Sequence, residues 1–173
     1  MVAHTKRCVP LDLVTAETAE RRPRVQRPRV GNDDLCDQPL LDVAEKIRTR
    51  QISPIEVTGR VLARIDLLDD TLNAFVTVLS EQARHEAREA EREIVAGHYR
   101  GPLHGVPISI KDLFATKGIR TTAGSRVLAD HVSDHDATVV ERLRTAGAIV
   151  VGKTNMLIFG TQRRSPDHPR VHG

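Results

Sequence analysis

The stretch Gly-Pro-Leu-His-Gly-Val-Pro-Ile-Ser-Ile-Lys-Asp, residues 101–112, decides the fold of this chain. Within it, residues 106–110 are apolar except for Ser109, and turn-forming residues flank them. A short apolar run of this kind is typical of a strand that is buried on both faces. Pro107 lacks a backbone N–H and therefore belongs at the start of the strand or on an edge strand. We predict a buried strand that ends in Lys111.

A second strand of the same character follows a predicted helix. Apolar residues at helical spacing over residues 136–146 indicate the helix, with Asp136 as its N-cap and Gly147 as its stop signal. Residues 148–151, Ala-Ile-Val-Val, then form the second doubly buried strand. Helices that alternate with such strands predict an α/β fold with a partly parallel, mixed sheet covered by helices.

The preceding part of the chain is also patterned for helices. A first helix is predicted from about Pro39, and Ser53 begins a second helix with a capping-box pattern. The run Phe75–Leu79 is typical of a short strand. Ser80 is predicted to cap a third helix with a narrow face of alanines, which Gly97 ends.

Composition limits the classes of protein that the chain can represent. Of its 173 residues, 39% are hydrophobic and only 2% are aromatic, so we expect a core of aliphatic side chains. No apolar run approaches the roughly eighteen residues of a membrane span, and no targeting segment is recognisable. The two cysteines, Cys8 and Cys36, match no disulfide or zinc pattern, which favours free thiols and a cytoplasmic location.

Residues 1–37 are predicted to be a disordered basic N-terminal arm, because prolines interrupt them and their apolar residues have no sustained period. Five arginines and no acidic residue lie within residues 21–30. Such a run can contact nucleic acid or an anionic membrane surface. No aromatic side chain or recognition helix accompanies it, so we interpret the run Arg21–Arg29 as a solvated arm.

A lysine at the end of a buried strand has two interpretations. Burial disfavours the charged form of an ammonium group, so a buried lysine can become a neutral base that deprotonates a serine nucleophile. The structural alternative is that Lys111 emerges at the end of its strand and pairs with Asp112. Lys153 follows the second strand in the same way, and we interpret it as structural or solvated.

Three histidines are weaker candidates. His131 and His135 have the spacing of metal ligands on a helix, but the residues around them predict a loop and no third ligand is evident. His104 lies in a predicted turn, which we favour over a role as a catalytic base. We therefore assign no metal and no cofactor to the chain.

Three blocks of the sequence resemble, in the same order, the N-terminal part of the amidase signature family. They are residues 101–112, the Thr-Thr-Ala-Gly-Ser block at 121–125, and residues 136–156, which end in Gly-Lys-Thr-Asn-Met. The family includes bacterial amidases and the amidase-like subunit of glutamyl-tRNA amidotransferase. The resemblance implies that residues 38–160 are the N-terminal portion of an amidase domain, with a truncated form of the amidase signature fold.

The resemblance also implies hydrolysis of the C–N bond of a small-molecule amide. In the family a serine attacks the amide carbonyl and forms an acyl-enzyme, while a second serine, in a cis peptide, relays the proton to a lysine. Backbone N–H groups stabilise the oxyanion. The position of the catalytic lysine matches Lys111. The amidotransferase members leave partner amidotransferase subunits as an open alternative.

The family places both of its serines beyond the block that ends at Met156, and no Gly- and Ser-rich segment follows in this sequence. Ser165 stands between Arg164 and Pro166 and lacks the flanking glycines of such a segment. We therefore expect residues 161–173 to be an aberrant, unstructured tail, and an amidase-type hydrolase that is inactive as given. The alternatives are a pseudoenzyme, a binding module, or a piece that docks with a separately encoded remainder.

This departure from the family pattern predicts an interrupted reading frame or gene after about residue 160. Translation of the genomic DNA beyond that codon, in all frames, is expected to show a Gly- and Ser-rich amidase segment. The absence of such a segment from every frame would contradict the interruption.

Overall fold

The computed structural model describes residues 35–156. The predicted tail, residues 161–173, and residues 1–34 of the predicted arm lie outside the described part of the chain. The described structure begins within the end of that arm, where Leu35–Asp37 form a 3-10 helix (η1). Leu35 is buried against the helices that follow, so these residues are helical rather than disordered.

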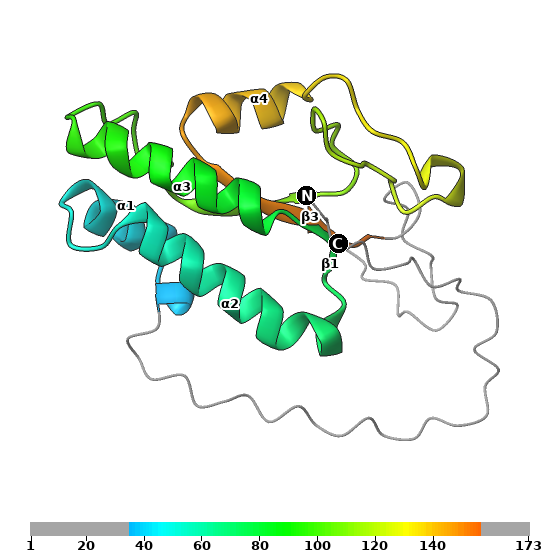
Figure 1. Ribbon diagram of the computed structural model, residues 1–173, viewed down its shortest axis with the longest axis horizontal. Helices are drawn as coiled ribbons and strands as arrows, with labels where there is room; N and C mark the ends of the chain where they lie inside the picture. The colour runs from blue at the N-terminus through cyan, green and yellow to red at the C-terminus, as the bar shows by residue number, and fades with distance from the viewer. Residues whose placement is uncertain (1–34, 157–173) are drawn as a thin grey trace, which may run out of the picture.

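The described residues form a three-stranded mixed sheet with helices packed on it, which confirms the predicted α/β fold (Figure 1). The strand order is β1-β3-β2, and β3 pairs antiparallel with β1 and parallel with β2. After η1, the elements in chain order are α1 (Leu40–Arg48), α2 (Pro54–Leu72), β1 (Phe75–Val78), α3 (Ser80–Val95), β2 (Pro107–Lys111), η2 (Arg126–Leu128), α4 (Thr138–Thr145) and β3 (Ile149–Thr154).

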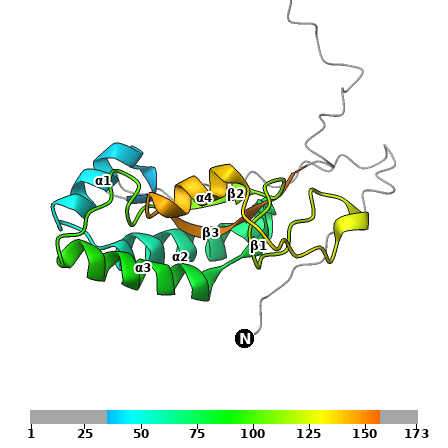
Figure 2. The same cartoon turned by 90° about the horizontal axis from the view of Figure 1, so that it is seen from above.

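Helices cover both faces of the sheet (Figure 2). On one face, α2 and α3 pack against β3 through a cluster of buried residues: Leu62, Ala83, Ala87, Ala90, Ile149 and Val151. On the other face, α4 packs over β2 and β3 through Val140, Ile110 and Val150. The small alanines let α3 approach the sheet closely, as their spacing in the sequence predicts.

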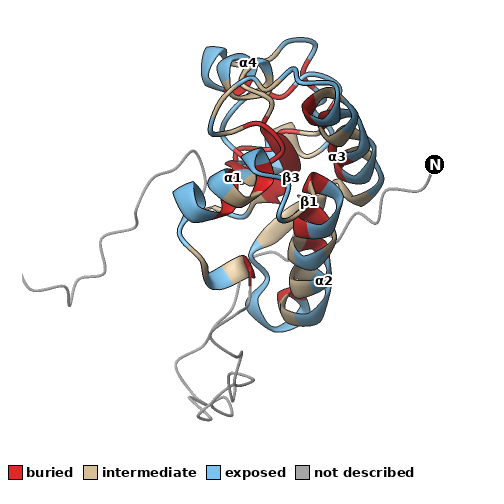
Figure 3. Cartoon of the chain, turned by 90° about the vertical axis from the view of Figure 1, so that its left-hand side faces the viewer, coloured by how far each residue is buried: buried red, intermediate tan, exposed pale blue. Residues whose placement is uncertain are grey.

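The two strands predicted to be buried on both faces differ in the structure. Strand β3 lies in the centre of the sheet, and its residues from Ile149 to Lys153 are all buried (Figure 3). Strand β2 lies at an edge, and Ser109 and Lys111 are exposed, so the prediction of two-sided burial is wrong for this strand. Its apolar residues serve one face and its start. Pro107 begins β2, as predicted.

Several predicted helix boundaries are confirmed. The Ser53 hydroxyl accepts a hydrogen bond from the Glu56 amide at 3.1 Å, and Pro54 is the first residue of α2. Gly97 and Gly147, which follow α3 and α4, have φ values of +88° and +84°. Glycine adopts this left-handed conformation without the steric cost of a Cβ atom, which explains both stop signals.

Two predicted N-caps are wrong. Ser80 is itself the first residue of α3, and its side chain caps nothing. Helix α4 begins at Thr138, without a side-chain cap. The Asp136 carboxylate instead accepts hydrogen bonds from the Lys117 amide at 2.7 Å and from the Arg144 guanidinium at 3.0 Å. It therefore ties the loop after β2 to α4 rather than beginning the helix.

The helices and the described cysteine bear on the expected location and thiol state. Within residues 35–156, no helix combines the length and the apolar character that crossing a membrane requires. Cys36 forms no disulfide in the described part of the chain, and Cys8 lies outside it.

Gly152 and Gly59 give a matched test of this packing. A Cβ atom at Gly152, in the centre of β3, would lie 2.5 Å from the Thr77 carbonyl oxygen and 2.9 Å from the Phe75 ring, whereas a Cβ atom at Gly59 meets nothing within 4 Å. We expect Gly152→Ala to lower the free energy of unfolding by about 1–3 kcal/mol, through overpacking. Gly59→Ala, within α2, should raise it by about 0.5–1 kcal/mol through helix propensity.

Urea unfolding of the two variants, each compared with the unsubstituted chain, measures both changes. A Gly152→Ala variant as stable as the unsubstituted chain would contradict the packing of β1 against β3 described here.

Candidate active site

Lys111 is the last residue of β2 and lies opposite Thr154 of β3. Successive side chains of a strand point to opposite faces, so Lys111 points away from the buried cluster that contains Ile110. Its side chain is exposed, and within residues 35–156 its amine makes no hydrogen bond or ion pair. The predicted burial of Lys111 is therefore wrong, because β2 is an edge strand in the described sheet.

The buried lysine is Lys153, whose side chain is 0% exposed. Its amine donates hydrogen bonds to the Phe114 carbonyl oxygen at 2.8 Å, to the Thr121 hydroxyl at 2.8 Å and to the Thr116 hydroxyl at 3.2 Å. The same nitrogen lies 3.5 Å from Asp112 Oδ1. Burial lowers the pKa of Lys153, and the Asp112 carboxylate opposes that shift. The structural interpretation of Lys153 is confirmed.

Asp112 pairs with Lys153 and not with Lys111, which corrects the structural alternative considered for Lys111. Asp112 is 1% exposed, and its Oδ2 atom accepts hydrogen bonds from both the amide and the hydroxyl of Thr122. Its backbone amide donates to the Thr154 carbonyl oxygen at 3.1 Å, and its carbonyl oxygen accepts from the Ala123 amide at 3.0 Å. The residue next to Lys111 is therefore held from both sides.

The Thr-Thr-Ala-Gly-Ser block forms a tight turn against Asp112. Ala123 and Gly124 both have positive φ, +50° and +69°, which agrees with the left-handed conformation expected of Gly124. The Ala123 amide donates to Asp112, and the amides of Gly124 and Ser125 donate to Thr122. In this conformation all three amides are already engaged, so none of them is available to stabilise an oxyanion.

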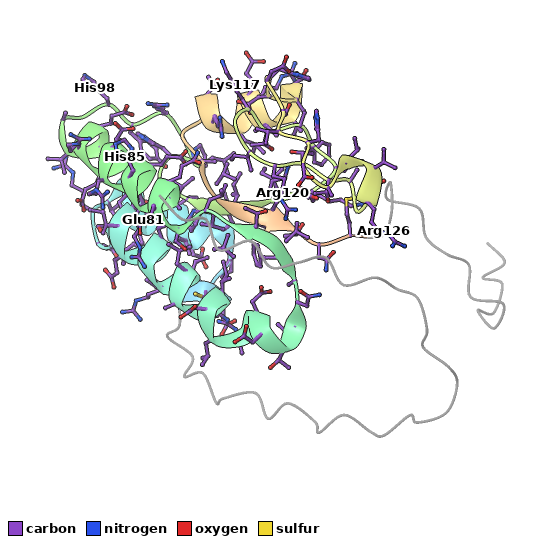
Figure 4. All side chains as sticks on the ribbon, turned by 45° about the vertical axis from the view of Figure 1, so that its right-hand side comes forward. Glu81, His85, His98, Lys117, Arg120 and Arg126 are labelled. Atoms are coloured by element: carbon purple, nitrogen blue, oxygen red, sulfur yellow. The ribbon has the colours of Figure 1, made fainter. Side chains whose placement is uncertain are left out.

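The charged side chains of the loop between β2 and α4 lie on its outer surface, where Figure 4 labels Lys117, Arg120 and Arg126. Arg120 donates hydrogen bonds to the Ala129 and Val76 carbonyl oxygens, at 3.1 and 3.4 Å, and so joins the loop to β1. The sequence reasoning missed this contact and the contacts of Thr116 and Thr121. The available signal was the position of Lys153 directly after a doubly buried strand.

His104 is a buried structural residue, in agreement with the turn predicted for it. Its Nδ1 atom accepts a hydrogen bond from the Arg100 amide at 3.1 Å, and its Nε2 atom lies 3.2 Å from Glu93 Oε2. Burial lowers the pKa of His104, the Arg100 charge lowers it further, and Glu93 opposes both effects. A histidine enclosed in this way is not placed to act as a catalytic base.

His131 and His135 do not form a helical pair. Both are exposed and lie in the loop before α4, where His135 Nδ1 lies 2.7 Å from Asp134 Oδ1. Residues 35–156 contain no group of three or more His, Cys, Asp or Glu side chains that could hold a metal ion.

Comparison with known proteins gives the family. The profile of the Amidase family matches residues 56–168. This chain belongs to the Amidase family. The match spans α2, β1, α3, β2, α4 and β3, and therefore contains both strand-end lysines and the loop between them.

Relatives and solved structures agree with this membership. The chain is 43% identical over 122 residues to the amidase-like subunit of glutamyl-tRNA(Gln) amidotransferase from Geobacter sp. strain M21, a match that covers 70% of this chain and 25% of that protein. The peptide amidase of Stenotrophomonas maltophilia superposes with a TM-score of 0.65 at 36% identity, over 69% of this chain and 25% of the amidase. A bacterial aryl acylamidase of the amidase signature family gives a TM-score of 0.66 at 32% identity, over 70% and 26% of the two chains.

The matched segment of this chain spans about a quarter of the length of these relatives, 25% for the amidotransferase protein and 26% for the aryl acylamidase. Its core, and the mixed sheet within it, is therefore one part of the amidase signature fold.

The environment of His104 predicts a pH dependence of stability. Because its pKa is lower in the folded than in the unfolded chain, the unfolded chain binds more protons below the usual value of 6.5. The contribution of neutral His104 is therefore complete above pH 6.5 and is lost as the pH falls through the lowered pKa. The free energy of unfolding should fall on acidification by at most about 1.4 kcal/mol per pH unit from this one proton.

Chemical unfolding between about pH 4.5 and about pH 7.5, a range that brackets the ordinary pKa of histidine, measures this slope. His104→Gln should flatten it, and His131→Gln, at an exposed loop position, is the matched control. An identical slope in the unsubstituted chain and in His104→Gln would contradict the assignment.

Proposed function

We propose that this chain contributes Lys111 as the proton acceptor of an amidase-type hydrolysis of carboxylic amides. Family membership supports the reaction class. The observation that carries the residue assignment is the contrast between the two strand-end lysines. Lys153 is enclosed by its hydrogen bonds, whereas the Lys111 amine is exposed and has no partner within residues 35–156.

In the proposed reaction, a serine oxygen forms a bond to the amide carbonyl carbon while its proton moves, through a second serine, to the Lys111 amine. The proton then passes to the leaving nitrogen as the C–N bond breaks, and water hydrolyses the acyl-enzyme. Lys111 must therefore be reachable from outside its own segment. Its exposed side chain on edge strand β2 satisfies this requirement.

We further propose that both serines come from polypeptide outside residues 35–156, so that this segment alone does not hydrolyse amides. The Ser125 hydroxyl accepts a hydrogen bond from the Val127 amide and begins η2, which is a structural role. Ser109 lies two residues before Lys111 on the exposed side of β2, with no activating base beside it in the described residues. The open edge of β2 is where the remainder of an amidase fold would continue the sheet.

The substrate we propose is a small-molecule amide, and the reaction needs no cofactor or metal. Partner amidotransferase subunits remain a proposal that rests on the Geobacter amidotransferase relative.

A chimera tests this proposal. Residues 35–156 replace the corresponding segment of the Stenotrophomonas maltophilia peptide amidase, and turnover is measured with a simple chromogenic amide. We expect turnover by the folded chimera and none by the 173-residue chain alone. Lys111→Ala should lower kcat by about 10³-fold or more, because the serine then lacks its proton acceptor.

Lys117→Ala is the matched control, since Lys117 is an exposed lysine of the adjacent loop, and its kcat should stay within about twofold. A Lys111→Ala chimera that retains full activity would overturn the assignment.

A further inference from the structure

The pairing of β2 with β3 is interrupted immediately before the end that carries Lys111. Ile108 lies opposite Val150, but the next residue, Ser109, lies opposite Gly152, so Val151 is an additional residue on β3. An irregularity of this kind breaks the ladder locally, and the register beyond it must be set again. Only the pairs from Ser109 to Lys111 lie beyond it, which is a short stretch to define a register.

Register beyond the irregularity decides which side chain of β2 faces the core. In the observed register Ile110 packs with Val140 and Val150, and Lys111 is exposed. A slip by one residue would exchange the two faces. The Lys111 amine would then enter the apolar space that Ile110 fills, at a large desolvation cost.

Lys153 sits at the centre of this short stretch, opposite Ile110, and contacts the chain that follows Lys111. Its hydrogen-bond acceptors, Phe114, Thr116 and Thr121, and its ion-pair partner Asp112 all lie within residues 112–121. These contacts need Asp112 to point toward β3 on the Lys153 side, which the slipped register does not allow.

A buried ion pair contributes little net stability, because desolvation offsets the attraction between the charges. Such a pair contributes more reliably by selecting one arrangement, since any other arrangement leaves a buried charge without partners. The Asp112–Lys153 pair, at 1% and 0% exposure, meets this condition.

We propose that Lys153 is a positioning residue, which sets the register of β2 on β3 beyond the irregularity and so determines that Lys111 faces outward. The structural part of this inference is independent of catalysis, and its catalytic consequence rests on the proposed function of Lys111.

Site-resolved hydrogen exchange of the full chain separates a local role from a general one. The Asp112 and Ala123 amides report on the segment beyond the irregularity, because they donate to Thr154 and Asp112. The Ile149 amide, which donates to Val106, reports on the ladder before it. Thr121→Val removes one acceptor of the Lys153 amine with little change of shape, and Thr121→Ser retains the hydroxyl.

We expect Thr121→Val to accelerate exchange at Asp112 and Ala123 by about 10- to 100-fold, the effect of losing one hydrogen bond to a charged group. Exchange at Ile149 should stay within about twofold, and Thr121→Ser should restore the slow exchange at all three amides. Lys153→Met should act in the same direction as Thr121→Val, with Lys117→Met as its control. Equal acceleration at Ile149 and Ala123, or no acceleration at either, would overturn the proposal.

The catalytic consequence has its own readout in the chimera described above. Thr121→Val should lower kcat about tenfold and leave KM within about twofold, because it displaces the proton acceptor and not the substrate. An unchanged kcat, beside accelerated local exchange, would overturn the link between Lys153 and Lys111. Full activity of Lys111→Ala would instead reject the proposed function and leave the exchange result standing.

Discussion

The burial of the Lys153 ammonium beside the Asp112 carboxylate is the interaction on which the carboxyl end of the sheet depends. Neither charge can enter the protein interior alone, because desolvation of an unpaired ion is costly. Here the lysine receives three oxygen acceptors as well as the carboxylate, and all of them come from the segment after β2. The pair therefore joins the central strand to the segment that carries the candidate catalytic lysine.

The rest of the described fold provides the setting for this pair. Strand β3 is enclosed by α2 and α3 on one face and by α4 on the other, which removes water from the strand that bears Lys153. Asp136 joins the loop after β2 to α4, and Arg120 joins the same loop to β1. The loop between the two lysines is thus fixed at several points, and the residue next to it, Lys111, is presented on an otherwise exposed edge.

Local signals predicted much of this structure, because they depend on neighbouring residues. The Ser53 cap, the stop at Gly147 and the two-faced burial of β3 are of this kind. The exchange of environments between Lys111 and Lys153 could not be predicted in the same way. Both follow apolar runs of similar length, and only the strand order, which places β3 between β1 and β2, makes one lysine central and the other peripheral.

The central claim is that the two lysines have divided their roles, with Lys153 enclosed and Lys111 available for chemistry. Modification of the folded 173-residue chain with an amine-reactive reagent, followed by peptide mass spectrometry, tests it most directly. The account predicts that Lys111 is modified at a rate similar to that of exposed Lys117, while Lys153 stays unmodified until the chain is unfolded. Modification of Lys153 in the folded chain as fast as that of Lys111 would contradict it.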